Sequence, residues 1–157
     1  MTTTLAKPGK YLTFKIDNES YGIEVLKVRE IIKIQQITRV PEMPNFIKGV
    51  INLRGKIIPV INLRLKLGME ETATTDSSCI IVVNGRAGNS QIGVIVDGVE
   101  EVSNIAENEI EQPPDFVAQQ NVKSILGMAK IKGVVKTLFD IDEVIGNDNL
   151  ELLHKAV

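Results

Sequence analysis

The sequence has little of what most catalytic and metal sites are built from. It contains one cysteine, one histidine and no tryptophan in 157 residues. A single cysteine excludes an internal disulfide, and Cys79 lies in the apolar run CIIVV, which is typical of a small buried hydrophobe. Zinc sites need several cysteine or histidine ligands, and His154 has no carboxylate cluster near it. We therefore expect no disulfide, no metal site and no catalytic nucleophile–histidine pair.

Other absences narrow the class of protein further. Neither the GxxxxGK[ST] nor the GxGxxG nucleotide-binding motif occurs. No apolar run approaches the roughly 20 residues of a membrane span, and the N-terminus has no signal-peptide core. The net charge is −2, whereas nucleic-acid phosphates favour a basic footprint. These features predict a cytoplasmic binding module without enzyme activity or cofactor, and with no nucleic acid and no direct membrane insertion among its contacts.

Charge is laid out in two runs of opposite sign. No acidic residue occurs between Glu42 and Glu70, and no basic residue occurs between Arg86 and Lys123. The basic residues of the first run are Lys48, Arg54, Lys56, Arg64 and Lys66. The acidic residues of the second run are Asp97, Glu100, Glu101, Glu107, Glu109, Glu111 and Asp115. Two solvated faces would explain this pattern. A docking surface of opposite-signed patches, which sets orientation and encounter rate more than affinity, would explain it equally well.

The main feature that is present is an internal repeat. The block GVINLRGKIIPVINLRLKLG at 49–68 recurs in outline at 127–146 as GMAKIKGVVKTLFDIDEVIG. Four anchors pair at one constant offset: 49/127, 55/133, 62/140 and 68/146. Upstream, GIEVLKVREI at 22–31 aligns with GVIVDGVEEV at 93–102. Self-similarity of this kind indicates one structural unit used twice.

Local patterns predict many short strands separated by glycine-marked turns, which is typical of an all-β fold with short helices. Strands are expected at 11–16, 20–25, 34–40, 50–53, 56–61, 79–83, 91–96, 101–105, 125–131 and 134–139. Short helices should follow the caps Asn62 and Asp140, and 26–32 should form a helical turn or an irregular crossover. Each half of about 75 residues would be marginal alone. We therefore expect two small five-stranded barrels that bury surface against each other.

Arg54 is the residue whose position suggests a role beyond folding. It lies at the tip of an apolar hairpin beside Gly55, where a turn needs a residue but not an arginine. A solvent-facing turn residue is the simplest interpretation. A guanidinium on a rigid hairpin is also a good planar donor for a partner, or for Glu30 across the fold. The second copy has Lys132 there, so the two halves need not bind the same molecule.

Four segments together resemble the CheW family of bacterial chemotaxis coupling proteins. They are YGIEVLKVREI, ITRVPEMPNFIKG, FIKGVINLRGKIIPVINLRLKLG and VIVDGVEEV, and the resemblance extends from about Tyr11 to Ile145. It departs at Asn62, where the family usually has aspartate, although both residues cap helices.

The resemblance implies a particular fold and domain organisation. The fold is two intertwined five-stranded SH3-like barrels related by a pseudo-twofold, with a short C-terminal helix. The residues outside it complete the expected organisation: a Thr-rich, flexible N-terminus at 1–10, one domain at 11–147 and a C-terminal helix at 148–157 with Leu150, Leu152 and Leu153 as its apolar positions. Within the domain, the two interlocked barrels would cover roughly 11–70 and 79–147, with strand exchange possible.

The resemblance also implies a function. It is that of a non-catalytic adaptor, recruited to membrane-associated arrays, that couples the cytoplasmic tips of methyl-accepting chemoreceptors to the regulatory domain of the histidine kinase CheA. Positions that match the family's binding residues are Val28, Glu30, Gly49, Arg54 and Val102. Val99 would join Val28 and Val102 in an apolar groove for a receptor's helical tip.

Two alternatives remain open at this point. The same coupling fold could serve as a scaffold in a receptor–kinase system outside chemotaxis. An oligonucleotide-binding barrel would need stacking aromatics on an electropositive strand face, and the chain has no tryptophan and two tyrosines.

Overall fold

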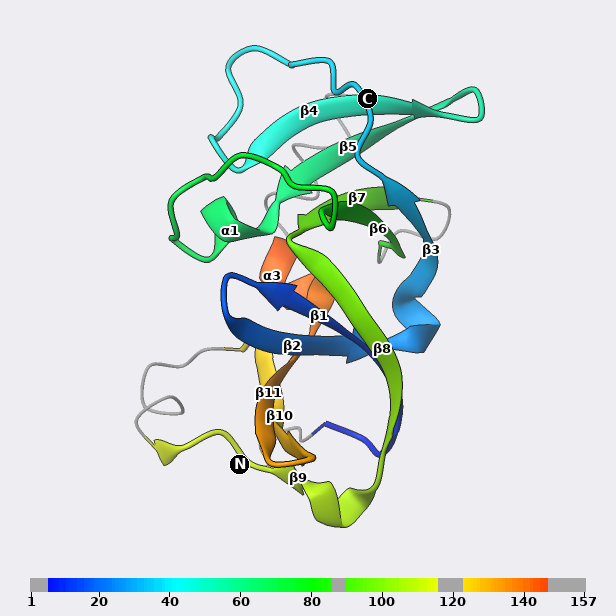
Figure 1. The fold of residues 1–157 in the computed structure, drawn as a ribbon. Coiled ribbons are helices and arrows are strands. Elements are labelled where there is room, and N and C mark those ends of the chain that lie inside the picture. Colours follow the sequence, from blue (N-terminus) through cyan, green and yellow to red (C-terminus); the bar gives the residue numbers. More distant parts are fainter. Residues whose placement is uncertain (1–5, 86–89, 116–122, 147–157) are drawn as a thin grey trace.

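The structure is a computed structural model that describes residues 6–85, 90–115 and 123–146 (Figure 1). Its strands are β1 (Gly9–Ile16), β2 (Glu19–Glu24), β3 (Val28–Lys33), β4 (Ile47–Leu53), β5 (Lys56–Asn62), β6 (Cys79–Asn84), β7 (Gln91–Val96), β8 (Gly98–Ile105), β9 (Ile110–Glu111), β10 (Ile125–Ile131) and β11 (Val134–Phe139). Its short helices are η1 (Val25–Lys27), α1 (Leu63–Lys66), η2 (Glu107–Glu109) and α3 (Ile141–Ile145). The expected all-β class with short helices is confirmed.

The strands form two curled sheets, one above the other in Figure 1. The upper sheet, which we call the central barrel, has the order β3-β6-β7-β5-β4. The lower sheet, the terminal barrel, has the order β8-β1-β2-β11-β10-β9 and contains the first and last strands of the described residues, β1 and β11. It has six strands instead of the expected five because η2 interrupts the path from β8 to β9. A bridge between Thr38 and Val50, with both N···O distances 2.8 Å, joins the ends of the central barrel.

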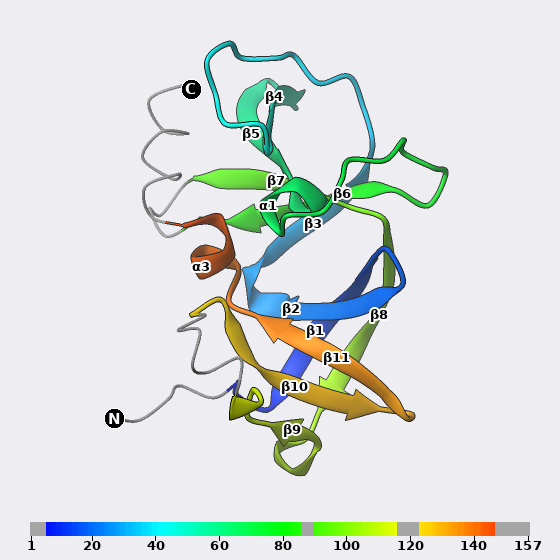
Figure 2. The same cartoon turned by 90° about the vertical axis from the view of Figure 1, so that its left-hand side faces the viewer.

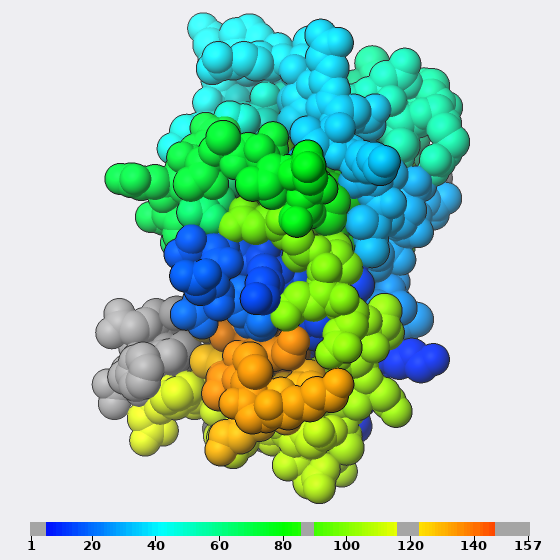
Figure 3. Space-filling view, in the orientation of Figure 1, coloured from blue at the N-terminus to red at the C-terminus, as the bar shows by residue number. Residues whose placement is uncertain are grey.

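Neither barrel is built from one half of the chain. The hairpin β1–β2 belongs to the terminal barrel, although β3, β4 and β5 belong to the central barrel. Conversely, the hairpin β6–β7 belongs to the central barrel, although the strands that follow it, β8 to β11, belong to the terminal barrel. Figure 2 shows β2 running beside the orange β11, and in the space-filling view the dark blue N-terminal hairpin lies directly on β11 (Figure 3). Strands are thus exchanged between the sequence halves 11–70 and 79–147.

The two halves repeat each other down to the strand register. Each exchanged hairpin docks through one parallel pair, in which Val60 faces Gly93 and Leu138 faces Gly22. These are equivalent positions in the repeat. Equivalent β-bulges interrupt the pairing of β3 with β6 and of β8 with β1. The predicted pseudo-twofold relation is confirmed by these shared irregularities, which a chance likeness of two barrels would not produce.

Alternating side chains divide the hydrophobic core into three parts, as the two-residue period of a strand requires. In β6, for example, Ile80 and Val82 face the interior of the central barrel, whereas Ile81 and Val83 face the terminal barrel. The cluster between the barrels also holds Leu12 and residues of α1 and α3, and we call it the central core. Because both barrels contribute to it, neither barrel buries its outer face without the other.

One local expectation was wrong, and another was right only in part. Segment 34–40 is not a strand, since it contributes only Thr38 to a bridge, and the strand of this region is β3. Ile34 and Ile37 both pack into the central barrel at a spacing of three, whereas a strand would alternate. The segment 26–32, expected to be a helical turn or an irregular crossover, begins in the helical turn η1, but its larger part belongs to β3.

The chain is packed earlier than the expected boundary at residue 11. Ala6 is buried and its N–H donates to the Leu126 carbonyl at 3.1 Å, and β1 begins at Gly9. Of the segment 1–10, the structure describes residues 6–10. The C-terminal helix expected at 148–157 lies outside the described residues.

Tyr11 gives the fold a predictable dependence on alkaline pH. Its side chain is buried, and its hydroxyl donates to the Lys7 carbonyl at 2.7 Å. Burial and the charge of Glu24 raise the pKa of Tyr11 to about 12, and the hydrogen bond offsets part of this rise. Folding therefore favours the neutral phenol, so its contribution is complete below pH 10 and is lost as the pH rises to about 12. The loss should total about 2–3 kcal/mol of unfolding free energy.

Urea unfolding between about pH 9 and about pH 12 tests this prediction. Tyr11→Phe should flatten the decline relative to wild type, leaving the smaller slope from Tyr21, whose pKa burial also raises. Equal slopes for the variant and the wild type would contradict the assignment to Tyr11.

Candidate partner-binding surface

Two equivalent strands, β3 of the central barrel and β8 of the terminal barrel, each carry apolar residues that continue the central core toward the surface. Val28 of β3 and Val99 of β8 pack against the central core. Three positions further along each strand, Ile31 is 44% exposed and Val102 is 56% exposed. The two pairs are related by the repeat. We call these four residues the seam strip, and both strands run along the right-hand side of Figure 1.

The exposure of Ile31 and Val102 is unusual because the residues opposite them on the adjacent strands are buried. Ile31 pairs with Ile81 and Val102 pairs with Leu12, and both neighbours lie in the central core at 1% and 3% exposure. The two exposed side chains therefore extend an apolar face from the inside of the molecule to its surface. Apolar surface that continues a core in this way marks an interaction site more often than an isolated exposed residue does.

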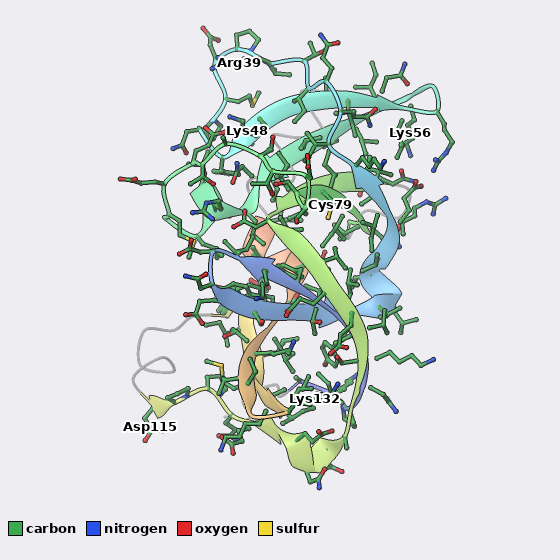
Figure 4. All side chains as sticks on the ribbon, in the orientation of Figure 1. Arg39, Lys48, Lys56, Cys79, Asp115 and Lys132 are labelled. Atoms are coloured by element: carbon green, nitrogen blue, oxygen red, sulfur yellow. The ribbon has the colours of Figure 1, made fainter. Side chains whose placement is uncertain are left out.

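Cys79 connects the two strands of the seam strip. It pairs with Lys33 at the end of β3, and its thiol is hydrogen-bonded to the backbone of Val99. Burial raises the pKa of the Cys79 thiol, and that hydrogen bond offsets part of the rise. Cys79 begins β6 and lies at the level of the central barrel, in the upper part of the molecule (Figure 4). It acts as a small half-buried side chain beneath the strip, in keeping with its apolar sequence context.

Glu30 and Arg54 are brought together in an ion pair at one end of the central barrel. Arg54 is at the tip of the β4–β5 hairpin, and its side chain is 70% exposed while that of Glu30 is 25% exposed. The turn has two positive φ values, 53° at Arg54 and 87° at Gly55, as a two-residue hairpin turn requires. Asn52 supports the turn by accepting the Gly55 N–H at 2.8 Å. The predicted alternative of a contact with Glu30 across the fold is therefore what the structure contains.

The same turn occurs in the second half without the same ion pair. Lys132 and Gly133 have φ values of 53° and 81°, close to those at the first turn. Glu101, the counterpart of Glu30, accepts a hydrogen bond from the Ser103 hydroxyl at 3.2 Å. Within the described part of the chain, Lys132 forms no ion pair. The Glu30–Arg54 pair is thus a property of one barrel only.

Arg54→Ala should change the unfolding free energy by no more than about 1 kcal/mol, because an exposed ion pair contributes little. The substitution keeps a Cβ at the same backbone conformation, so it adds no strain. Lys132→Ala is the matched control at the same φ in the other barrel. Urea denaturation of both variants measures the difference, and a loss several times larger in Arg54→Ala would show that the arginine holds the barrel together.

Gly49 has a structural reason to be glycine. Its φ is 142°, and a Cβ built there would lie 2.0 Å from the Thr38 carbonyl oxygen. This close approach permits the bridge between Thr38 and Val50 that joins the ends of the central barrel. Any partner contact at Gly49 would have to use its backbone, since the residue is buried. Its role in binding stays a prediction.

The opposite charge runs are partly paired with each other inside the molecule. Arg64 of the basic run donates to Asp97 of the acidic run at 2.5 Å. Lys48 of the basic run pairs at 2.5 Å with Glu71, which lies outside the acidic run. The two runs are therefore not simply two independent patches on the surface. Lys56 and Lys132 mark hairpin tips at opposite ends of the molecule (Figure 4).

Two further exposed apolar residues of this region, Leu26 and Ile31, are not among the predicted site residues. Leu26, in η1 just before β3, is 88% exposed. Ile31 is the counterpart of Val102, and the alignment of 22–31 with 93–102 contained the signal that would have identified it. Nothing in the sequence around Leu26 distinguishes it from the half-buried Val25.

Metal and membrane sites can be assessed for the described residues only. Among them, no three His, Cys, Asp or Glu side chains lie close enough together to hold a metal ion. In the same part of the chain, no helix combines the length and apolar character needed to cross a membrane.

Comparison with known proteins places this geometry in a family. Residues 10–149 match the model of the CheW-like domain. The chain is 34% identical to the chemotaxis protein CheW of Klebsiella aerogenes, covering 92% of this chain and 86% of that protein. It is also 34% identical to the chemotaxis protein CheW of Bacillus subtilis, covering 95% and 94%.

A solved structure agrees with these matches. The scaffolding protein TtCheW of Thermoanaerobacter tengcongensis superposes with a TM-score of 0.79 at 35% identity, over 91% of this chain and 96% of that one. With its two pseudo-symmetric barrels and this similarity across nearly its whole length, the chain belongs to the CheW-like family of chemotaxis scaffold proteins.

Proposed function

We propose that this protein is a non-catalytic adaptor that couples transmembrane chemoreceptors to the histidine kinase CheA. It would work in the cytoplasm, recruited to the receptor arrays at the membrane, and would let receptors control the rate of the kinase. Family membership over residues 10–149 supports the adaptor role. The observation that carries the proposal furthest is the seam strip, in which each half of the repeat has one exposed apolar residue, Ile31 or Val102, beside a half-buried one that packs against the central core.

The seam strip suits the helical tip of a receptor. Helix-in-groove recognition uses apolar anchors at helical spacing on the partner, and Val28, Ile31, Val99 and Val102 provide an apolar surface for them. Glu30 precedes Ile31 in β3 but pairs with Val82 of the central-barrel interior, so the Glu30–Arg54 pair belongs to the other face of this strand. The guanidinium, more exposed than its carboxylate partner, is available to a second acceptor on the receptor or the kinase.

The barrel edges suit a homologous barrel of the kinase. A sheet edge presents backbone groups that can pair with a strand of another chain. In the central barrel the edge strands are β3 and β4, which the Thr38–Val50 bridge joins at one point within the described segments. We assign these edges to pairing with the regulatory domain of CheA.

Ternary assembly tests the proposal. A cytoplasmic receptor fragment, CheA and this protein are mixed, and autophosphorylation of the kinase is measured with and without the adaptor. We expect the adaptor to be required for receptor control of the rate. Normal folding with no binding to either component would contradict a chemotaxis role and would favour a different receptor–kinase system.

A charge exchange distinguishes contact by Arg54 from positioning by Arg54. Glu30→Arg combined with Arg54→Glu preserves an ion pair at this place but reverses the groups that a partner meets. If Arg54 contacts the partner, the double variant should assemble no better than Arg54→Ala. Recovery of assembly by the double variant would show that only the internal pair matters.

A further inference from the structure

Two ion pairs occupy corresponding places in the two halves of the molecule, and their polarity is opposite. Arg64 of α1 donates to Asp97, which follows β7, at 2.5 Å. Lys27 of η1, which follows β2, donates to Asp142 of α3 at 2.8 Å. Arg64 and Asp142 are the same position in the repeat, the second residue of each short helix. The first clamp (Arg64–Asp97) has its cation on the helix, and the second clamp (Lys27–Asp142) has its anion there.

Each clamp joins the two halves of the chain. α1 follows β5, and Asp97 follows β7, which runs parallel to β5. In the same way α3 follows β11, and Lys27 follows β2, which runs parallel to β11. Each clamp therefore fastens an exchanged hairpin to the barrel that receives it. Lys27 and Asp97 are not at identical positions in the repeat, since Lys27 aligns with Gly98, one residue after Asp97. Both nevertheless lie in the connection between an exchanged strand and the strand that follows it.

The helix member of each clamp is the more buried one. The side chain of Arg64 is 12% exposed and that of Asp142 is 7% exposed, against 32% for Asp97 and 39% for Lys27. A charge held at such a place is only weakly screened by water, so the sign of its neighbour matters. Arg64 is held further by the Glu70 carbonyl, which accepts its Nε–H at 3.0 Å.

An alternative arrangement of the same strands brings like charges together at both clamps. If each hairpin stayed with its own half, β2 would lie beside β5 and β7 beside β11. Arg64 would then face Lys27, and Asp142 would face Asp97. We propose that the inverted polarity of the two clamps selects the exchanged fold over the arrangement in which each half closes its own barrel.

Backbone pairing does not make this choice by itself. The two parallel pairs have the same register, with Val60 facing Gly93 in one and Leu138 facing Gly22 in the other. A glycine stands at the docking point of both hairpins, so either hairpin would fit beside either strand. The charges of the clamps distinguish the two hairpins where the repeated backbone does not.

Reversal of one clamp removes the discrimination while it keeps an attraction between positions 64 and 97. Asp17, which lies 3.7 Å from Arg64 and donates its N–H to Asp97 at 2.6 Å, loses a cation at position 64 and gains one at position 97. In Arg64→Asp with Asp97→Arg, opposite charges still meet across the exchanged contact. The own-half arrangement now also brings opposite charges together at both places. The control adds Lys27→Asp and Asp142→Arg, which reverses every sign and restores the discrimination.

Two disulfide reporters distinguish the arrangements, in a Cys79→Ala background. Glu19 and Val135 lie one step before the paired residues Ser20 and Lys136, so Glu19→Cys with Val135→Cys reports the exchanged fold. Ile57 is the repeat counterpart of Val135, so Glu19→Cys with Ile57→Cys reports the own-half arrangement. All three positions are exposed.

The full chain is refolded from denaturant under oxidising conditions, and cross-linked species are separated on non-reducing gels. With native clamps we expect the Glu19–Val135 cross-link to dominate. Reversal of the first clamp should raise the Glu19–Ile57 fraction about tenfold, since attraction replaces repulsion at two places, and reversal of both clamps should return it to the native level. A Glu19–Val135 cross-link between two chains also counts as exchange, because the same clamps form between copies.

Three results would overturn the proposal. The Glu19–Ile57 fraction could equal the Glu19–Val135 fraction with native clamps. It could stay unchanged when the first clamp is reversed. It could also rise equally in the variant with both clamps reversed, which would show that any disturbance of the clamps, and not their polarity, is responsible.

Discussion

Gly49→Ala should lower the unfolding free energy by more than about 3 kcal/mol. The added Cβ would lie 2.0 Å from the Thr38 carbonyl oxygen, at a φ of 142° that side-chain-bearing residues rarely adopt. The neighbouring atoms are backbone, so they cannot rotate away. The substitution should therefore open the Thr38–Val50 bridge as well as destabilise the fold. Urea denaturation, with amide hydrogen exchange at Val50 as the local readout, measures both effects.

Gly127→Ala is the matched control in the terminal barrel. Its Cβ would lie 2.8 Å from the Glu111 carbonyl oxygen, and its backbone is outside the positive-φ region. β9 is a two-residue edge strand that can shift, so we expect a loss of only about 1–2 kcal/mol. Equal losses at the two glycines would contradict the special role of Gly49. If Gly49→Ala stays folded and stable but loses partner binding, the Gly49 backbone contacts the partner and is not needed to close the central barrel.

Ile31→Asp and Val102→Asp should each weaken binding of a receptor hairpin fragment at least about a hundredfold, equivalent to about 3 kcal/mol. The receptor would desolvate the new carboxylate without providing a partner for it. Both side chains are about half exposed in the free protein, so the folded state should survive. Titration with the fragment, checked by circular dichroism, measures the effect. Val134→Asp, at a similarly exposed valine on the β10–β11 hairpin, is the control.

Two outcomes would contradict the placement of the receptor on the seam strip. Wild-type affinity in both folded variants would place the receptor elsewhere, and equal weakening in Val134→Asp would indicate a nonspecific charge effect. Val28→Asp is a poor probe, because Val28 packs against the central core and its replacement would destabilise the protein as well.

The repeat made the local structure predictable. Both glycine blocks form hairpins, and both expected caps act as caps. The side chain of Asn62 accepts the Leu65 N–H at 3.3 Å, and that of Asp140 accepts the Asp142 N–H at 3.1 Å. Turns and caps are decided by a few neighbouring residues, which is why the residue pattern sufficed. The resemblance to the family predicts the pseudo-twofold relation, which the strand register and the equivalent β-bulges of the two halves confirm.

The long-range arrangement was not predictable from the residues in the same way. A repeat shows which segments are alike, but Gly22 and Gly93 would fit beside either Val60 or Leu138. The exchange depends on contacts between distant residues, such as Arg64 with Asp97, that no local pattern reveals. The β-branched residues of segment 34–40 predict a strand, whereas its path across the barrel end is set by the bridge at Thr38.

The exchange of hairpins also governs when the chain can fold during synthesis. The central barrel needs β7, which ends at Val96, and the terminal barrel needs β11, which ends at Phe139. A ribosome-bound chain that stops before Val96 thus holds two incomplete sheets whose edges lack a partner. Such edges are prone to pair with other chains. Chaperone dependence and aggregation of nascent chains should therefore be greatest at intermediate lengths and should fall sharply once the second half emerges.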